Sequence, residues 1–150
     1  MLLRGDRAMV AIAIVLDVAF HAGRSGTVSG LDIAERLGEA RRGIEPLLQS
    51  LSRAGIFSST RGPKGGYRLG RAARDITLEA ILAAGSGDGE EEAPAAGPSP
   101  LQQKVIAPLR DELDATLREA LSKITVAELL RRATAAGLRR PAVEPLNFAI

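Results

Sequence analysis

Residues 61–67 read Arg-Gly-Pro-Lys-Gly-Gly-Tyr, a basic and glycine-rich segment between two β-prone runs at 56–59 and 67–69. This arrangement predicts a β-hairpin with Arg61 and Lys64 at its tip. Such cations neutralise phosphate or enter the minor groove of DNA, and glycine lets a backbone approach phosphate closely. The alternative interpretation is a plain surface loop with incidental charge. A nucleotide-phosphate loop is discounted, because the spacing of a Walker motif is absent and no helix follows.

A helix over residues 41–54 is predicted immediately before this hairpin, with one apolar and one polar face. Isoleucine and leucine recur at 44, 47, 48 and 51, which is the spacing of a buried helical face. The opposite face mixes arginine, glutamine and glutamate, which pair with guanine, adenine and cytosine in the major groove. An ordinary solvated face is the alternative, but the basic hairpin that follows favours nucleic acid. With the two hairpin cations, the predicted DNA-binding residues are Arg41, Arg42, Glu45, Gln49, Arg53, Arg61 and Lys64.

Three further helices are predicted to position these residues. A helix over about 31–37, opened by Ser29 and ended by Gly38, is joined to the next helix by very few residues. Two short amphipathic helices at this spacing indicate a helix-turn-helix, and the hairpin supplies its wing. A first helix over 6–22 is apolar nearly all round and is expected to be buried, and Thr77 opens a fourth helix over 78–84. The predicted fold is mainly α with a small β-hairpin.

The C-terminal half is predicted to mediate dimerisation. A long helix begins between Leu101 and Pro108, and a last helix, opened by Thr125, runs to Ala136. The predicted division is a DNA-binding domain over 1–84, a flexible acidic loop rich in glycine and proline over 85–100, a dimerisation segment over 101–137 and a tail over 138–150. The apolar stripe expected to meet a second subunit in a homodimer comprises Ile106, Leu109, Leu113, Leu117 and Leu121.

Composition argues against an enzyme or a metal protein. The chain of 150 residues has no cysteine, and therefore no disulfide and no thiolate ligand, and no catalytic triad or carboxylate pair stands out. We expect no cofactor. His21, the only histidine, is interpreted as a partly buried residue at a helix end that lacks a carboxylate partner at helical spacing. The net charge of +2 is uneven, because residues 1–75 carry 12 Lys and Arg against 7 Asp and Glu, which suits an anionic partner.

The N-terminal sequence favours a cytoplasmic location. Arg4, Asp6 and Arg7 interrupt it and no cleavage-site pattern follows, so no signal peptide is predicted. The longest apolar run, residues 8–16, is too short to cross a bilayer. We therefore expect no membrane partner.

Several motifs together resemble the Rrf2 family of bacterial winged-helix regulators, which includes iron–sulfur cluster and nitric-oxide-responsive repressors. They are Asp-Arg-Ala at 6–8, Ile-Ala-Glu-Arg at 33–36, Ile-Glu-x-Leu-Leu at 44–48, Leu-x-x-Ala-Gly at 51–55, Arg-Gly-Pro-Lys-Gly-Gly-Tyr-Arg-Leu at 61–69, Ile-Thr-Leu at 76–78 and Ile-Thr-Val-Ala-Glu-Leu-Leu at 124–130. The resemblance covers about residues 3–133 and implies a homodimer on a dyad-symmetric operator of double-stranded DNA. It implies base- or groove-contacting roles for Arg42, Glu45 and Arg61.

The chain departs from this family where the cluster-binding members have three cysteines. The corresponding loop, 85–100, contains neither cysteine nor histidine, so thiolate ligation of iron is chemically impossible. Arg7 and Gly43 also stand where the family usually has an aromatic residue. Two alternatives to a DNA-binding repressor without a cofactor stay open. One is a binding module that acts mainly through a protein partner, and the other is a small-molecule sensor with a pocket between the wing domain and the long helix.

Overall fold

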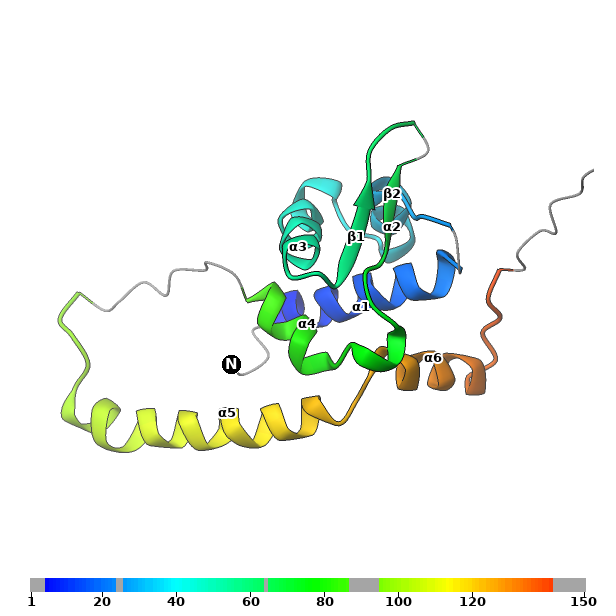
Figure 1. The fold of residues 1–150 in the computed structure, drawn as a ribbon. Coiled ribbons are helices and arrows are strands. Elements are labelled where there is room, and N and C mark those ends of the chain that lie inside the picture. The colour runs from blue at the N-terminus through cyan, green and yellow to red at the C-terminus, as the bar shows by residue number, and fades with distance from the viewer. Residues whose placement is uncertain (1–4, 24–25, 64, 87–94, 142–150) are drawn as a thin grey trace, which may run out of the picture.

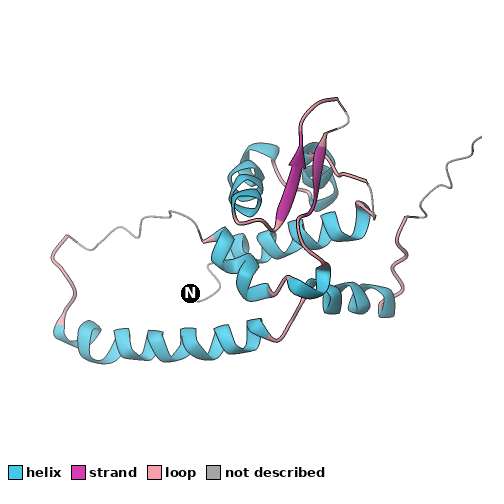
Figure 2. Ribbon diagram, viewed as in Figure 1, coloured by secondary structure: helices cyan, strands magenta, loops and turns pink. Residues whose placement is uncertain are grey.

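Helices and one β-hairpin account for the part of the chain that the computed structural model describes, residues 5–23, 26–63, 65–86 and 95–141 (Figure 1; Figure 2). The prediction of a mainly α fold with a small hairpin is confirmed. None of these helices is long and apolar enough to span a bilayer. In chain order the elements are α1 (Gly5–His21), α2 (Gly30–Leu37), α3 (Arg41–Arg53), β1 (Phe57–Thr60), β2 (Gly66–Leu69), the short helix η1 (Ala73–Asp75), α4 (Leu78–Gly85), the π turn η2 (Gln102–Ile106), α5 (Ala107–Ser122) and α6 (Val126–Ala135).

Local capping fixes both ends of α2, the first helix of the pair α2 and α3. The Ser29 hydroxyl accepts a hydrogen bond from the Asp32 N–H at 3.1 Å and opens α2, and Gly38 ends α2 with a φ of 69°. Residues 38–40 then join α2 to α3, as the predicted helix-turn-helix requires. On α3 the residues at 44, 47, 48 and 51 are all buried, as their spacing predicts.

The core lies between α1 and the helices around it. Ile14, Val15 and Val18 of α1 are completely buried. α3 packs against α2, α4 and β1, whereas α1 passes beneath α2 and α3 and packs against α2, α4, α6 and β2 (Figure 1). This position explains why its sequence is apolar on nearly every side. Only its N-terminal end is open, where Met9 is exposed.

The hairpin is attached to the residues that precede α2. β1 and β2 pair antiparallel, with Phe57 opposite Leu69. Beyond this pairing, the Tyr67 N–H donates to the Val28 carbonyl at 2.7 Å, and the Val28 N–H donates to the Tyr67 carbonyl at 2.9 Å. These two bonds hold the base of the wing beside the start of the helix-turn-helix.

The long C-terminal helix starts before α5. The Gln102 N–H donates to the Ser99 hydroxyl at 3.2 Å, and the Ser99 N–H donates to the Gln102 side-chain oxygen at 2.7 Å, which is a reciprocal cap. In the π turn that follows, the Ala107 N–H donates to the Gln102 carbonyl. Pro108 has no N–H to donate to the Lys104 carbonyl, which favours this wider turn. The helix therefore begins one residue earlier than the expected window and continues through the proline.

After α5 the chain returns to the core through two backbone hydrogen bonds. The Leu78 N–H donates to the Ile124 carbonyl, and the Val126 N–H donates to the Ile76 carbonyl, both at 2.9 Å. Val126 is completely buried. The start of α6 is thereby fixed to the start of α4, and α5 is anchored at its C-terminal end.

A partly buried ion pair joins α1 to α2. The Arg36 guanidinium donates two hydrogen bonds to the Asp17 carboxylate, at 2.9 Å and 2.8 Å. Asp17 is 8% exposed, and its hydrogen bond raises the pKa of the Arg36 guanidinium above the ordinary value. Nε2 of His21 lies 3.6 Å from Oδ1 of the same carboxylate. The interpretation of His21 as lacking a carboxylate partner is therefore wrong, because residues four apart lie on the same side of a helix.

Replacing Arg36 with methionine is expected to lower the free energy of unfolding by about 2 kcal/mol, because the Asp17 carboxylate stays buried without its guanidinium. This value is below the usual cost of breaking a buried pair, since the Arg36 side chain is about one-third exposed. Urea unfolding followed by circular dichroism measures the loss. The control is the double variant Asp17→Leu/Arg36→Met, which removes both charges and is expected to recover part of the stability. Equal losses in the two variants would contradict this explanation.

Candidate nucleic-acid interface

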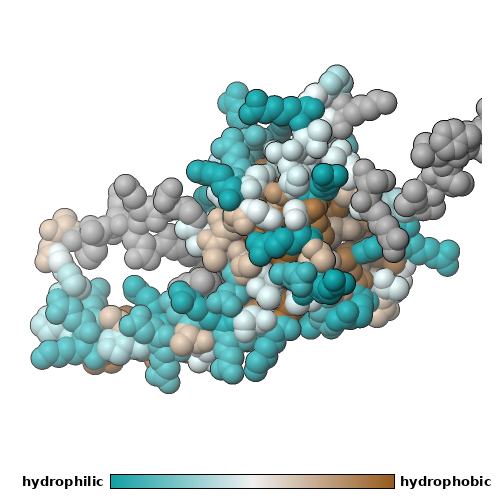
Figure 3. Space-filling view, viewed as in Figure 1, coloured by the Kyte–Doolittle hydropathy of each residue, from teal (hydrophilic) through white to brown (hydrophobic). Residues whose placement is uncertain are grey.

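The polar face of α3 is exposed and carries most of the predicted DNA-binding residues. Arg41, Arg42, Gln49 and Arg53 are exposed, and Glu45 is half-buried. Among the residues that the structure describes, none of these three arginines has an ion-pair partner. Hydrophilic residues cover α3 and the adjoining end of the hairpin in Figure 3. The guanidinium groups are therefore available to an anion from outside the chain.

The hairpin tip projects on the same side of the molecule as α3 (Figure 1). Arg61 is exposed and follows directly on β1, whereas Lys64 lies outside the described residues. A Cβ on Gly65 would lie 2.2 Å from the Thr60 carbonyl oxygen, and one on Gly66 would lie 2.5 Å from a carbonyl oxygen of the segment before α2. The turn and its attachment therefore require both glycines, independently of any approach to phosphate.

Tyr67 of the hairpin lies near the start of α3 and is not among the predicted DNA-binding residues. Its ring packs against Phe57, with 5.7 Å between the ring centroids. Partial burial raises the pKa of the Tyr67 hydroxyl above its ordinary value, the Glu45 carboxylate adds to this rise, and the Arg41 guanidinium opposes it. The hydroxyl is thus within electrostatic reach of two candidate DNA-binding residues. The sequence feature that could have identified Tyr67 as part of the interface is its position at the end of the Gly-Gly-Tyr motif.

The environment of Tyr67 is measurable because Tyr67 is the only tyrosine in the chain. Glu45→Gln is expected to lower the pKa of the Tyr67 hydroxyl, since it removes a nearby negative charge. The folded state holds this proton more tightly than the unfolded state, so the stabilisation is complete below the unfolded pKa and is lost as the pH rises through the folded pKa. Phenolate absorbance in an alkaline titration measures the pKa, and urea unfolding at increasing pH measures the loss of stability. Glu119→Gln on α5 is the control. An equal change in the pKa of Tyr67 in the two variants would contradict a specific influence of Glu45.

The predicted dimerisation stripe divides into two parts. Ile106, Leu109 and Leu113 are between 41% and 46% exposed. Leu121, however, is buried in the core of its own chain, and Leu117 packs against that core. Leu121 therefore does not lie on the exposed stripe, because the C-terminal end of α5 is already covered within the chain.

The exposed apolar surface extends instead toward the start of the helix. Leu101 and Val105 are also exposed. Both precede α5, and the predicted stripe, which begins at Ile106, does not contain them. Hydrophilic residues cover most of the visible side of α5 in Figure 3, and the helix lies apart from the rest of the molecule except near its C-terminal end (Figure 1).

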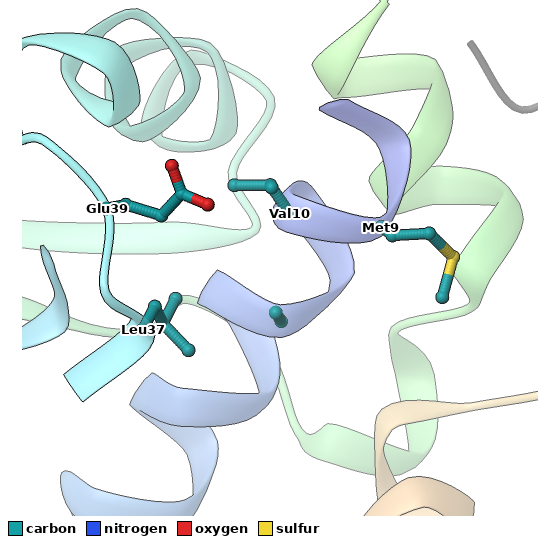
Figure 4. A pocket seen from close by; sticks show the side chains of 5 residues that line it. Met9, Val10, Leu37 and Glu39 are labelled. Carbon is teal, nitrogen blue, oxygen red and sulfur yellow. The ribbon is translucent and has the colours of Figure 1, made fainter. Parts of the chain in front are cut away.

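An open hollow of about 330 Å³ lies between α1 and the end of α2. Met9, Val10 and Ala13 line it from α1, and Leu37 and Glu39 line it from the other side (Figure 4). Glu39 is the single polar side chain among these five, so they offer no convergent polar set to orient a small effector. The hollow also lies away from the expected position between the wing domain and the long helix, and it gives no support to a small-molecule sensor.

Comparison with known proteins identifies the family. The model of the Rrf2 family, described as an iron-dependent transcriptional regulator, matches residues 5–132. The chain belongs to the Rrf2 family. The HTH-type transcriptional regulator IscR of Photobacterium profundum is 42% identical over 79 residues, which are 53% of this chain and 45% of that protein. The matched segment thus spans slightly less than half the length of such curated relatives.

Solved structures of two regulators share the fold of this Rrf2 chain. IscR of T. potens superposes with a TM-score of 0.67 at 30% identity, over 90% of each chain. CymR, the global cysteine regulator of B. subtilis, superposes with a TM-score of 0.65 at 25% identity, over 88% of this chain and 98% of that one. These similarities confirm the predicted winged helix-turn-helix. A family of transcriptional regulators also agrees with the expectation that the chain is not an enzyme.

The residues of this Rrf2 chain do not fit an iron–sulfur cluster, although the family is described as iron-dependent. Such clusters are held by cysteine thiolates, and the chain contains no cysteine. His21, its only histidine, lies beside Asp17 within α1. In the segments that the structure describes, no three His, Cys, Asp or Glu side chains come together to hold a metal ion.

Proposed function

We propose that this Rrf2 chain is a sequence-specific DNA-binding repressor that acts as a homodimer in the cytoplasm and without an iron–sulfur cluster. The observation that carries the proposal is the position of α3 and the hairpin tip on one side of the molecule, with exposed arginines on both. Within the described residues, Arg41, Arg42, Arg53 and Arg61 all lack ion-pair partners. Such a group of cations suits the phosphate backbone of DNA.

The proposed docking follows from the shapes of the two elements. α3 enters the major groove, where Arg42 and Gln49 reach guanine and adenine edges and Glu45 accepts a hydrogen bond from cytosine. The hairpin then follows the DNA backbone and places Arg61, and Lys64 beyond the described residues, at the adjacent minor groove. Arg41 and Arg53 bind phosphates at the two ends of α3.

Homodimerisation is proposed from the exposed part of the apolar stripe. Ile106, Leu109 and Leu113 lie on a helix that is on the opposite side of the molecule from α3 (Figure 1). A second copy that covers this stripe by a two-fold contact leaves both copies of α3 and both hairpins accessible. Two recognition helices related by a dyad bind half-sites about 34 Å apart, which predicts a dyad-symmetric operator.

The proposal is tested by the DNA fragments that the purified chain selects from genomic DNA. A shared dyad-symmetric sequence is expected, and the chain is expected to lower transcription from a reporter that carries the selected fragment. Uniform weak binding to every duplex would contradict the proposal. A stoichiometric protein partner together with no preferred DNA sequence would favour the binding module instead.

A further inference from the structure

Gly43, in the first turn of α3, is a glycine that the fold itself does not require. Other glycines have evident reasons: Gly38 and Gly62 have φ values of 69° and 113°, and a Cβ on Gly65 or Gly70 would lie 2.2 or 2.5 Å from a backbone oxygen. A Cβ on Gly43 would have nothing within 4 Å, and its backbone is ordinary helix. Among the glycines whose surroundings the structure describes, Gly43 alone combines these two features.

Pro46, three residues later, is a second residue in α3 that does not favour a helix. It lies inside α3 and is exposed, and it has no N–H to donate to the Arg42 carbonyl. Glycine and proline are the two residue types that stabilise a helix least. Residues three apart are neighbours on a helix surface, so Gly43 and Pro46 form one uncharged flank without long side chains, the Gly43–Pro46 flank.

The charges beside this flank favour a polyanion as its binding partner. Arg41 and Arg42 lie in the same helical turn as Gly43, are exposed and lack an ion-pair partner within the described residues. When these arginines bind a polyanion, the neighbouring flank lies against that polyanion as well. Glycine permits a close approach of backbone to a ligand, and a proline ring offers apolar contact to a sugar or a thymine methyl group.

We propose that the Gly43–Pro46 flank is a specificity-determining surface at which the backbone of α3 contacts DNA without an intervening side chain. This inference rests on the proposed DNA-binding function and adds two residues to it. The space around Gly43 is open in the chain without DNA, and the DNA occupies this space in the complex. A side chain added at position 43 therefore leaves the fold intact and collides with the operator.

The experiment compares Gly43→Ala and Gly43→Leu with Ser52→Ala. Alanine or leucine at position 43 is expected to raise Tm by up to about 2–4 °C, because each favours helix more than glycine does. Both are expected to weaken binding to the operator selected by the wild-type chain by about tenfold or more, with the larger loss for leucine. Ser52→Ala also favours helix, and it removes a buried hydroxyl without a described partner rather than altering the exposed flank, so it is expected to leave operator affinity unchanged.

The possible results separate this inference from the function on which it rests. A rise in Tm with unchanged affinity and unchanged sequence preference in both Gly43 variants would overturn the inference and leave the DNA-binding function in place. A wild-type chain that selects no sequence would overturn both. Reduced affinity in the Gly43 variants, together with a retained fold by circular dichroism and normal binding by Ser52→Ala, is the result that supports the flank.

Discussion

Alanine at Arg42 or at Arg61 is expected to lower the affinity for the selected operator by about a hundredfold at fixed salt concentration. A well-formed side-chain contact to a base contributes about 1–3 kcal/mol, and a two-fold complex loses that contact twice. Arg42 is expected to matter for one base position of each half-site, and Arg61 for the adjacent minor groove. Fluorescence anisotropy with labelled operator and with a random duplex measures both losses.

Arg74→Ala is the matched control for these two variants. It removes the same charge from an exposed residue of η1, which lies on the α6 side of the molecule rather than beside α3 (Figure 1). Its effect on operator affinity is expected to be small. If Arg74→Ala weakened binding as much as Arg42→Ala and Arg61→Ala did, net charge rather than the proposed interface would explain DNA binding.

Glutamate at both Leu109 and Leu113 is expected to convert the homodimer to a monomer and to lower operator affinity by more than about a hundredfold, because one half-site supplies only part of the contacts. Two buried carboxylates without partners oppose any close contact of this stripe with a second copy. The residues are exposed in the single chain, so the fold of the monomer is expected to survive. Analytical ultracentrifugation gives the mass, and circular dichroism reports the fold.

Leu138→Glu is the control for the dimer variants. Leu138 is an exposed leucine after α6 and lies outside the stripe. This variant is expected to remain dimeric and to bind the operator normally. A Leu109→Glu/Leu113→Glu variant that stayed dimeric would show that the second copy binds elsewhere on the chain.

The local elements of the fold follow from the sequence because their signals are close together in the chain. The spacing of Ile44, Leu47, Leu48 and Leu51 predicts the buried side of α3, and Ser29 marks the start of α2. Capping and helical periodicity act over three to seven residues, so they appear in the sequence without knowledge of the tertiary structure. The same local signals identified the hairpin and therefore most of the candidate interface.

Contacts between distant segments were not predictable in this way. The Asp17–Arg36 pair joins residues 19 positions apart, and nothing in the local pattern of either helix indicates the other. Leu121 fits the helical stripe of α5, but the return of the chain to α4 buries it. Tyr67 is similar, because its position near α3 depends on the attachment of the hairpin to Val28. The contact between His21 and Asp17, by contrast, was visible as a spacing of four residues.

The most direct test of the central proposal is the ratio of affinities for the selected operator and for a random duplex of equal length, measured with the wild-type chain at the same salt concentration. A specific regulator is expected to bind its operator at least about a thousandfold more tightly, with two chains on each duplex. Equal affinity for the two duplexes, at any number of bound chains, would contradict sequence-specific recognition by α3 and the hairpin.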